Sequence, residues 1–282
     1  MKEQIKSEIL LSALPYFQQW QNKTIVIKYG GHAMQNEELC KSVMKDLVLL
    51  NLVGIRIVLV HGGGPKINEL LKLYGKESEF INGLRYTDKE TMDIVQMTLV
   101  GDINKNLVSM ICKQGGKAIG LCGMDDKILI AEKIKNPDLG FVGKVKDVNC
   151  DFLNLLLDNG YIPVLSSVAV DENMNTYNVN ADHAASKVAA TMKAEKFILI
   201  TDTPGILEDI NDPSTLISKI NIDDLPLLKK KKIISGGMIP KVDGCVEAVR
   251  QGVNSAHIVD GTKEHSILVE LFSKEGIGTM FR

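Results

Sequence analysis

The chain has few aromatic residues and almost no excess charge. Phe, Trp and Tyr make up 5% of its 282 residues, and the formal net charge is −2. A nucleic-acid-binding surface needs basic residues to neutralise phosphates, and often aromatic side chains on which bases stack. No segment approaches the ~18 consecutive apolar residues of a membrane-spanning helix. We therefore expect no nucleic acid and no membrane among its partners.

Cysteine is scarce and follows no pattern. No CxxC pair occurs, and no Cys/His cluster has the spacing of metal ligands; the five cysteines are Cys40, Cys112, Cys122, Cys150 and Cys245. This favours reduced thiols that fill small apolar spaces, and it predicts no metal site in the protein itself. Residues 1–6 lack an apolar signal core and the pattern of a transit peptide. We expect a cytoplasmic protein, or one of the plastid stroma if an organelle encodes it.

Two common nucleotide-binding motifs are missing as well. The run that starts at Gly62 matches the first two glycines of GxGxxG, but its sixth position is Ile67. Close helix–strand packing at the third glycine is thereby compromised, and no acidic residue ends a strand about 20 residues further on. No glycine-rich loop leads into Gly-Lys-Ser/Thr, as a Walker A loop does. These absences exclude a P-loop enzyme and argue against a dinucleotide-dependent dehydrogenase.

What the chain does contain is strands that end in glycine turns. Residues 24–27 are a β-branched run typical of a strand, and Lys28 and Gly30-Gly31 follow. Residues 55–60 form a second such run, which leads directly into His61-Gly62-Gly63-Gly64-Pro65-Lys66. Glycine turns can aim backbone N–H groups at an anion, and a lysine adds positive charge. The pattern indicates a phosphate site at the strand ends.

Strand and helix patterns alternate along the chain. Helical periodicity occurs at 37–52, 65–73, 151–158 and 181–193, and residues 235–241 introduce a further helix that ends at 251. Strand-like runs occur at 117–121, 162–170, 197–201 and 256–259. Such alternation predicts an α/β fold, with an open, mainly parallel sheet and crossover helices. The length allows two lobes, whose boundary we place near residues 170–180.

Four segments outside this alternation carry their own predictions. Residues 3–20 form a helix that Pro15 should kink, and its apolar stripe must be buried, for instance against another subunit. Residues 79–87 form a hairpin with a turn at Asn82-Gly83. Residues 88–114 form two helices. Residues 128–148 form a hairpin on the rim of the sheet.

Several residues have the character that phosphoryl transfer requires. Glycine turns occur at 30–31, 62–64 and 236–237, and Lys28 and Lys241 lie beside two of them. Asp182 comes at the start of a helix that Asn180 should cap. Backbone N–H groups and lysines can neutralise the charge that develops on a transferring phosphoryl group. We expect His61 to be a turn residue rather than a base.

Five motifs, in this order and at these separations, resemble the amino-acid kinase family over essentially all 282 residues, and most closely its members that phosphorylate N-acetyl-L-glutamate. They are Val26-Ile27-Lys28-Tyr29-Gly30-Gly31, His61-Gly62-Gly63-Gly64-Pro65, Asn82-Gly83-Leu84-Arg85-Tyr86-Thr87, Asn178-Val179-Asn180-Ala181-Asp182 and Gly236-Gly237-Met238-Ile239-Pro240-Lys241. The resemblance implies a sheet between helices with an N-terminal kinked helix (1–22), an acyl-amino-acid-binding and dimerisation lobe (23–175) and an ATP-binding and regulatory lobe (176–282).

The resemblance also implies roles for individual residues. Lys28 and Lys241 would stabilise the transition state, with Asp182 holding both. The substrate would be bound by Gly31, Gly63, Gly64, Arg85, Asn178 and Asn180. ATP, together with Mg²⁺, would be bound by Lys28, Gly30, Asp202, Thr203, Pro204, Gly205, Ile206, Leu207, Ile233, Ile234, Ser235 and Lys241. The guanidinium fork of Arg85 suits a carboxylate.

Control by L-arginine is a further implication of the resemblance. Members that arginine inhibits form a homohexamer, a trimer of dimers joined by the N-terminal helix, and photosynthetic members bind the PII signalling protein. The inhibitor site would include Lys219, His265, Glu270, Gly276 and Gly278. Two alternatives stay open: a kinase for an N-modified 2-aminoadipate in lysine biosynthesis, one methylene longer than glutamate, and a catalytically inactive relative that senses amino acids.

Overall fold

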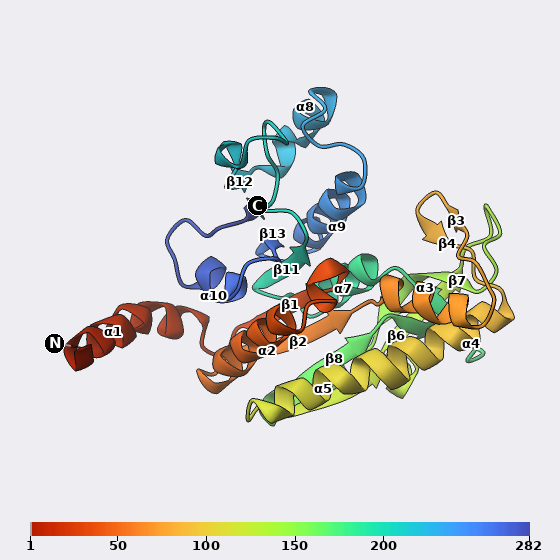
Figure 1. Cartoon of the computed structure of the whole chain (residues 1–282), viewed down its shortest axis with the longest axis horizontal. Helices are drawn as coiled ribbons and strands as arrows, with labels where there is room; N and C mark the ends of the chain where they lie inside the picture. Colours follow the sequence, from red (N-terminus) through yellow and green to blue (C-terminus); the bar gives the residue numbers. More distant parts are fainter. Residues whose placement is uncertain (1) are drawn as a thin grey trace.

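A sheet of eight strands runs through the centre of the molecule, in a computed structural model that describes residues 2–282 (Figure 1). Its strand order is β12–β14–β13–β11–β1–β2–β8–β5, and all neighbours are parallel except β13 and β14. The strands are β1 (Thr24–Tyr29), β2 (Arg56–His61), β5 (Ala118–Cys122), β8 (Ile162–Ser166), β11 (Lys196–Thr201), β12 (Lys219–Ile220), β13 (Ser255–Asp260) and β14 (Thr279–Phe281). The predicted open, mainly parallel sheet is confirmed.

Helices cover both faces of this sheet. One face packs against α2 (Glu37–Leu52), α5 (Asn104–Lys113) and α10 (Ser266–Leu271). The other packs against α6 (Asp151–Asp158), α7 (Ala181–Thr191) and α9 (Met238–Arg250). Side chains alternate between the two cores, as in β1, where Ile25 and Ile27 face the first and Val26 the second. A strand buried on both faces reads as a continuous apolar run, which is why these strands were recognisable.

A small closed barrel corrects two of the expectations. It consists of β6 (Leu129–Lys133), β7 (Val142–Val148), β9 (Val168–Val170) and β10 (Thr176–Val179). The 128–148 hairpin therefore belongs to the barrel, not to the rim of the main sheet. The predicted strand 162–170 is two strands, because β8 ends at Ser166 and β9 starts at Val168 in the other sheet. Both halves are fully buried, so the apolar run continues across the break.

The segment from 88 to 114 forms three helical pieces rather than two. A π-helical stretch, η2 (Met97–Ile103), joins α4 (Lys89–Gln96) to α5. Upstream, α3 (Gly64–Leu73) and the predicted hairpin of β3 (Phe80–Ile81) and β4 (Leu84–Arg85) are present. In the C-terminal part, α8 (Leu225–Lys230) lies between β12 and α9. The short 3₁₀ turns are η1 (Gly31–Met34), η3 (Asp125–Lys127), η4 (Pro213–Thr215) and η5 (Ile222–Asp224).

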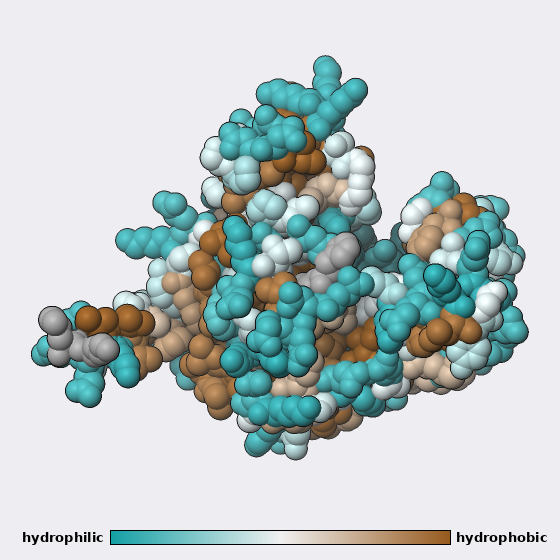
Figure 2. All heavy atoms as spheres, in the orientation of Figure 1, coloured by the Kyte–Doolittle hydropathy of each residue, from teal (hydrophilic) through white to brown (hydrophobic). Residues whose placement is uncertain are grey.

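The predicted N-terminal helix is α1 (Lys2–Trp20), and it extends away from the body of the molecule (Figure 1). Its last turn is anchored: Trp20 is buried, and its Nε1 donates to Leu271 O at 3.0 Å. Further out, Ile9 and Leu10 are 62% and 66% exposed, and Figure 2 shows this apolar surface. The chain itself therefore does not bury the stripe. Among residues 2–282, no helix combines the length and apolar character needed to cross a bilayer.

Candidate active site

The site is built at the carboxyl edge of the parallel sheet. β1 and β2 are neighbours in register, with Lys28 opposite Val60 and Tyr29 opposite His61. Both strands therefore end at the same level, and their glycine turns lie side by side; Gly62 N donates to Tyr29 O at 3.4 Å. In open α/β sheets this edge is where ligands bind.

A carboxylate between two lysines lies at the centre of the site. Asn180 caps α7 by accepting from His183 N at 3.0 Å, and this places Asp182 in the first helical turn. Asp182 Oδ1 lies 2.8 Å from Lys28 Nζ, and Oδ2 lies 3.3 Å from Lys241 Nζ. The structure thus brings together a strand end, the start of α7 and the start of α9. Two positive charges face a common point.

Burial and the two lysines have opposite effects on the protonation of Asp182. Burial alone would raise the pKa of Asp182, but the ammonium groups of Lys28 and Lys241 outweigh it and hold the pKa below its usual range. Asp182 is therefore ionised at pH 7. Three charged groups with a net charge of +1 suit an anionic ligand.

A cavity of about 230 Å³ opens beside these charges. All six residues predicted to bind substrate line it: Gly31, Gly63, Gly64, Arg85, Asn178 and Asn180, together with Lys28, Gly30 and Asp182. Arg85 is buried, its guanidinium donates to Ser78 Oγ and, at 3.3 Å, to Gly64 O, and it lies 4.7 Å from the ring centre of Phe80. Sequence analysis missed Ser78 and Phe80, which follow no motif and come from the segment just before Arg85.

Two of the glycines cannot be replaced without rearrangement. Gly31 has φ +75°, and a Cβ there would lie 2.7 Å from Asp202 Oδ1. A Cβ on Gly63 would lie 2.2 Å from Ile103 Cδ1 and 2.8 Å from Leu99 Cδ2. Real Cβ atoms do not approach neighbours so closely, so the backbone of both turns passes where side chains would clash.

Besides Lys28, Gly30 and Lys241, the residues predicted to bind ATP come from two further loops. Asp202, Thr203, Pro204, Gly205, Ile206 and Leu207 follow β11, and Ile233, Ile234 and Ser235 lie between α8 and α9. Ile206 and Ile234 are buried in the core, so only their backbone can face a nucleotide. A Cβ on Gly31 would lie 2.7 Å from Asp202 Oδ1, so the first loop passes close to the Gly31 turn. Within residues 2–282, no group of three or more His, Cys, Asp and Glu side chains could hold a metal ion.

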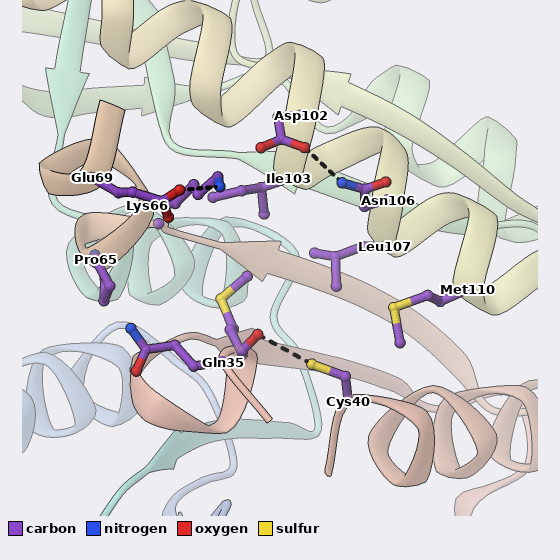
Figure 3. Close-up of a pocket in the computed structure, with 13 residues that line it drawn as sticks. Gln35, Cys40, Pro65, Lys66, Glu69, Asp102, Ile103, Asn106, Leu107 and Met110 are labelled. Carbon is purple, nitrogen blue, oxygen red and sulfur yellow. Dashed lines mark hydrogen bonds and ion pairs between the residues drawn. The ribbon is translucent and has the colours of Figure 1, made fainter. Parts of the chain in front are cut away.

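A larger cavity of about 520 Å³ adjoins the first and shares Gly31 and Gly63 with it (Figure 3). Its wall is largely apolar, with Ile103, Leu107 and Met110 on one side. The charged pair Lys66–Glu69, at 2.9 Å, is neutral overall. Neither Lys28 nor Lys241 lines this cavity, whereas Lys28 and Asp182 line the smaller one. The smaller cavity is therefore our candidate active site.

The residues predicted to bind arginine do not all come together. Lys219, Glu270 and Gly276 line a cavity of about 450 Å³ next to Tyr16 and Trp20 of α1. Glu270 already accepts from Ile277 N and Gly278 N, at 2.7 and 3.0 Å, and pairs with His257 at 2.6 Å. His265 does not line this cavity; it pairs with Asp46 of α2 at 2.6 Å. Lys196 and His257, which do line it, carry no sequence signal.

Comparison with known proteins agrees with this architecture. The profile of the "Amino acid kinase family" matches residues 23–260. Curated relatives named acetylglutamate kinase include that of Clostridium kluyveri, 55% identical over 97% of both chains, and that of Archaeoglobus fulgidus, 50% identical over 97% of this chain and 98% of the relative.

Solved structures show the same fold. N-acetylglutamate synthase from Neisseria gonorrhoeae, complexed with coenzyme A and N-acetyl-glutamate, aligns at a TM-score of 0.84 and 24% identity over 96% of this chain, which spans 62% of the synthase. Carbamate kinase from Giardia lamblia bound to AMP-PNP aligns at 0.67 and 16% identity, over 92% of this chain and 98% of the kinase. The extent of the profile match and the identity to curated relatives leave one conclusion: the chain belongs to the amino acid kinase family.

Proposed function

We propose that this chain transfers the γ-phosphoryl group of ATP to the side-chain carboxylate of N-acetyl-L-glutamate, a step of arginine biosynthesis. One observation carries the proposal: Asp182 pairs with both Lys28 and Lys241, and Asp182 and Lys28 line a cavity that also contains Arg85. The relatives named acetylglutamate kinase, which are about half identical over nearly their whole length, support it.

The chemistry needs positive charge more than a base. A glutamate side chain has an ordinary pKa of about 4.3, so the attacking carboxylate is already ionised at pH 7. Its oxygen attacks the γ-phosphorus, an acyl phosphate forms, and the bond to the leaving oxygen of ADP breaks. Lys28 and Lys241 neutralise the charge on the transferring group, and the Gly31 and Gly63 N–H groups donate to its oxygens.

Substrate and nucleotide would approach from opposite sides. The buried guanidinium of Arg85 binds a carboxylate of the amino acid, and Asn178 and Asn180 line the same cavity. ATP lies along the loops at 202–207 and 233–235, where backbone rather than the buried Ile206 and Ile234 side chains is available. ATP supplies the phosphoryl group, and Mg²⁺ bound to its phosphates supplies further positive charge.

The test is a coupled ADP-release assay with three acceptors in parallel: N-acetyl-L-glutamate, glutamate and N-acetyl-2-aminoadipate. We expect N-acetyl-L-glutamate to have the highest kcat/KM, by roughly 10-fold or more over the longer analogue, because a methylene is worth about that much in a fitted pocket. A preference for the aminoadipate derivative would assign the chain to the alternative kinase. No turnover with any acceptor would favour the inactive sensor.

We propose further that L-arginine inhibits the enzyme and binds in the cavity between α1 and α10. Glu270 and Lys219 line this cavity with Tyr16 and Trp20, so a ligand there would contact both the N-terminal helix and the C-terminal part of the chain. The exposed apolar residues of α1, among them Ile9 and Leu10, support a proposed homohexamer in which this helix docks on another subunit. We also propose a cytoplasmic location. The PII signalling protein is a further proposed partner, to be tested by whether it co-elutes with this protein.

Removing residues 1–14 tests the arginine and hexamer proposals together. The truncation keeps Trp20, whose contacts anchor the helix to the body of the protein. We expect a smaller oligomer by light scattering, with kcat retained. Arginine sensitivity should fall at least about tenfold, because the truncated chain keeps the cavity residues Tyr16 and Trp20 but loses the exposed apolar part of α1 through which the proposed hexamer forms. A truncated protein that stays hexameric and fully inhibited would contradict the proposal that α1 forms the hexamer and couples it to arginine inhibition.

A further inference from the structure

His61 stands directly before the glycine turn of the site, yet it is not the turn residue that the sequence suggested. It is the last residue of β2 and is fully buried. Its ring makes two contacts: Nδ1 lies 3.0 Å from Gly62 O, and Nε2 lies 3.1 Å from Asn104 Nδ2. Neither contact is to a predicted site residue, so the ring acts through its neighbours.

The partners of the ring determine where its proton is. A carbonyl oxygen accepts and an amide nitrogen donates. Asn104 Nδ2 is identified as the nitrogen because it also lies 2.8 Å from Val164 O and 3.2 Å from Leu121 O. Nδ1 of His61 therefore carries the proton and donates to Gly62 O, and the unprotonated Nε2 faces the Asn104 NH2, whose two hydrogens are shared among Nε2, Val164 O and Leu121 O. Burial lowers the pKa of His61 to about 4, so the ring is neutral at pH 7.

We propose that His61 and Asn104 are positioning residues that hold the Gly62–Gly63 peptide with the Gly63 N–H turned toward the transferring phosphoryl group. A peptide unit is planar and trans, so its C=O and N–H point in opposite directions. Fixing the oxygen of Gly62 therefore also fixes the direction of the Gly63 N–H. The inference rests on the proposed function for what that N–H contacts.

The direction follows from the two faces of the sheet. Along β2, Ile57 and Leu59 face the core beneath α2 and α5, and Val58 and Val60 face the core beneath α7. By alternation, His61 lies on the α5 side, where Asn104 is found. The Gly62 oxygen is held on that side, and the Gly63 N–H points to the α7 side. There, Ala181 Cβ is 3.1 Å from where a Cβ on Gly62 would lie.

The π-helical stretch η2 brings both supports to the turn. Leu99 and Ile103, at its middle and end, pack beneath Gly63, and Asn104 is the first residue of α5. A π turn shifts the side chains of a helix out of α-helical register, and such turns are frequent at functional sites. Ile103 is seen beside the larger cavity in Figure 3. One helical segment thus packs under the glycine turn and also binds the histidine that holds its carbonyl.

The first experiment observes the proton directly. ¹⁵N NMR of protein labelled at its five histidines distinguishes the two ring nitrogens, and the His61 signals are those missing from a His61→Asn sample. We expect a neutral ring protonated at Nδ1 throughout pH 5.5–8, in contrast to an ordinary histidine, which titrates near about 6.5. A ring protonated at Nε2, or one that titrates in this range, would overturn the proposal. This readout needs no substrate, so it stands even if N-acetyl-L-glutamate is not the acceptor.

The second experiment compares two variants that both remove the ring. In His61→Asn the side-chain amide nitrogen can occupy the position of Nδ1 and still donate to Gly62 O. In His61→Gln the amide reaches the position of Nε2 and contacts Asn104 instead. We expect kcat of His61→Gln to be about tenfold or more below that of His61→Asn, with KM for the acceptor within about threefold, since the Gly63 N–H acts mainly on the transition state.

Folding is controlled by thermal unfolding, and both variants lose the same buried ring. Equal kcat values in two folded variants would overturn the proposal, as would a loss that falls on KM alone. If either variant does not fold, the NMR result on the unaltered protein decides.

Discussion

Replacing Asp182 by Asn should separate catalysis from stability in this site. The carboxylate lies 2.8 and 3.3 Å from two ammonium groups, and its side chain is 20% exposed. Its two contacts put the lysine nitrogens at most about 8 Å apart, and at an effective dielectric constant of about 20 their mutual repulsion is then about 2 kcal/mol or more. The amide keeps the shape but not the charge. We expect kcat to fall roughly 10²–10³-fold, because neither lysine is held in place.

The matched control is Glu247→Gln, which removes a carboxylate 2.8 Å from Lys187 at the interface of α7 and α9, away from the cavity. ADP release gives kcat, and urea unfolding gives the free energy of unfolding for both variants. Asp182→Asn should lose about 2 kcal/mol at pH 7 and Glu247→Gln less than about 1 kcal/mol, with unchanged kcat. If the kcat of Asp182→Asn stayed within threefold of the unaltered protein, the reasoning about the lysine pair would be wrong.

The pH dependence of this stability difference has a definite sign. The folded pKa of Asp182 is held below its unfolded value of about 3.9. The carboxylate therefore stabilises the fold above about pH 4, and that contribution is lost as pH falls through the lower, folded pKa. The free-energy difference between the unaltered protein and Asp182→Asn should be constant from pH 8 to pH 5 and shrink below pH 4. A difference that grew on acidification would contradict the assignment.

Four further variants, with Lys187→Ala as a control, test other interactions in the molecule. Lys28→Ala and Lys241→Ala should each lower kcat by about 10²-fold while the protein stays folded, and Lys187→Ala should leave kcat unchanged. Near-normal turnover in both Lys28→Ala and Lys241→Ala would contradict the proposed mechanism. Arg85→Lys should raise KM for the acyl amino acid more than for ATP, since lysine cannot form the bidentate fork; equal changes would argue against a carboxylate contact. Burial raises the pKa of Asp46 to about 6, so the folded state is destabilised as pH rises through 4–6. The unfolding free energy of Asp46→Asn, relative to the unaltered protein, should rise by about 2 kcal/mol from pH 4 to pH 7; a constant difference would contradict this.

Local rules were enough to predict the six longer strands of the main sheet and the position of its glycine turns. β1 and β2 are apolar runs that stop at glycines, and Asn180 signals the start of α7 by its capping preference. The barrel could not be predicted in this way. At Ser167 the chain leaves one sheet for another, but residues on both sides are buried, and the apolar pattern reports burial without saying which sheet provides it.

Local sequence rules likewise predicted the charged residues of the site but not the residues that position its glycine turn. Lys28, Asp182 and Lys241 stand next to glycines or a helix cap, so their role can be proposed from their immediate neighbours in sequence. Asn104 has no such neighbour, and its role depends on reaching His61, 43 residues away, from the first turn after a π-helical segment. The α-helical periodicity used to predict residues 88–114 assumes a constant register, and a π turn breaks that register. The contacts of His61 with Asn104 and Gly62 therefore could not be predicted from the sequence pattern and required the three-dimensional structure. Once these contacts are known, the position of the ring proton follows from the two atoms that the buried imidazole contacts.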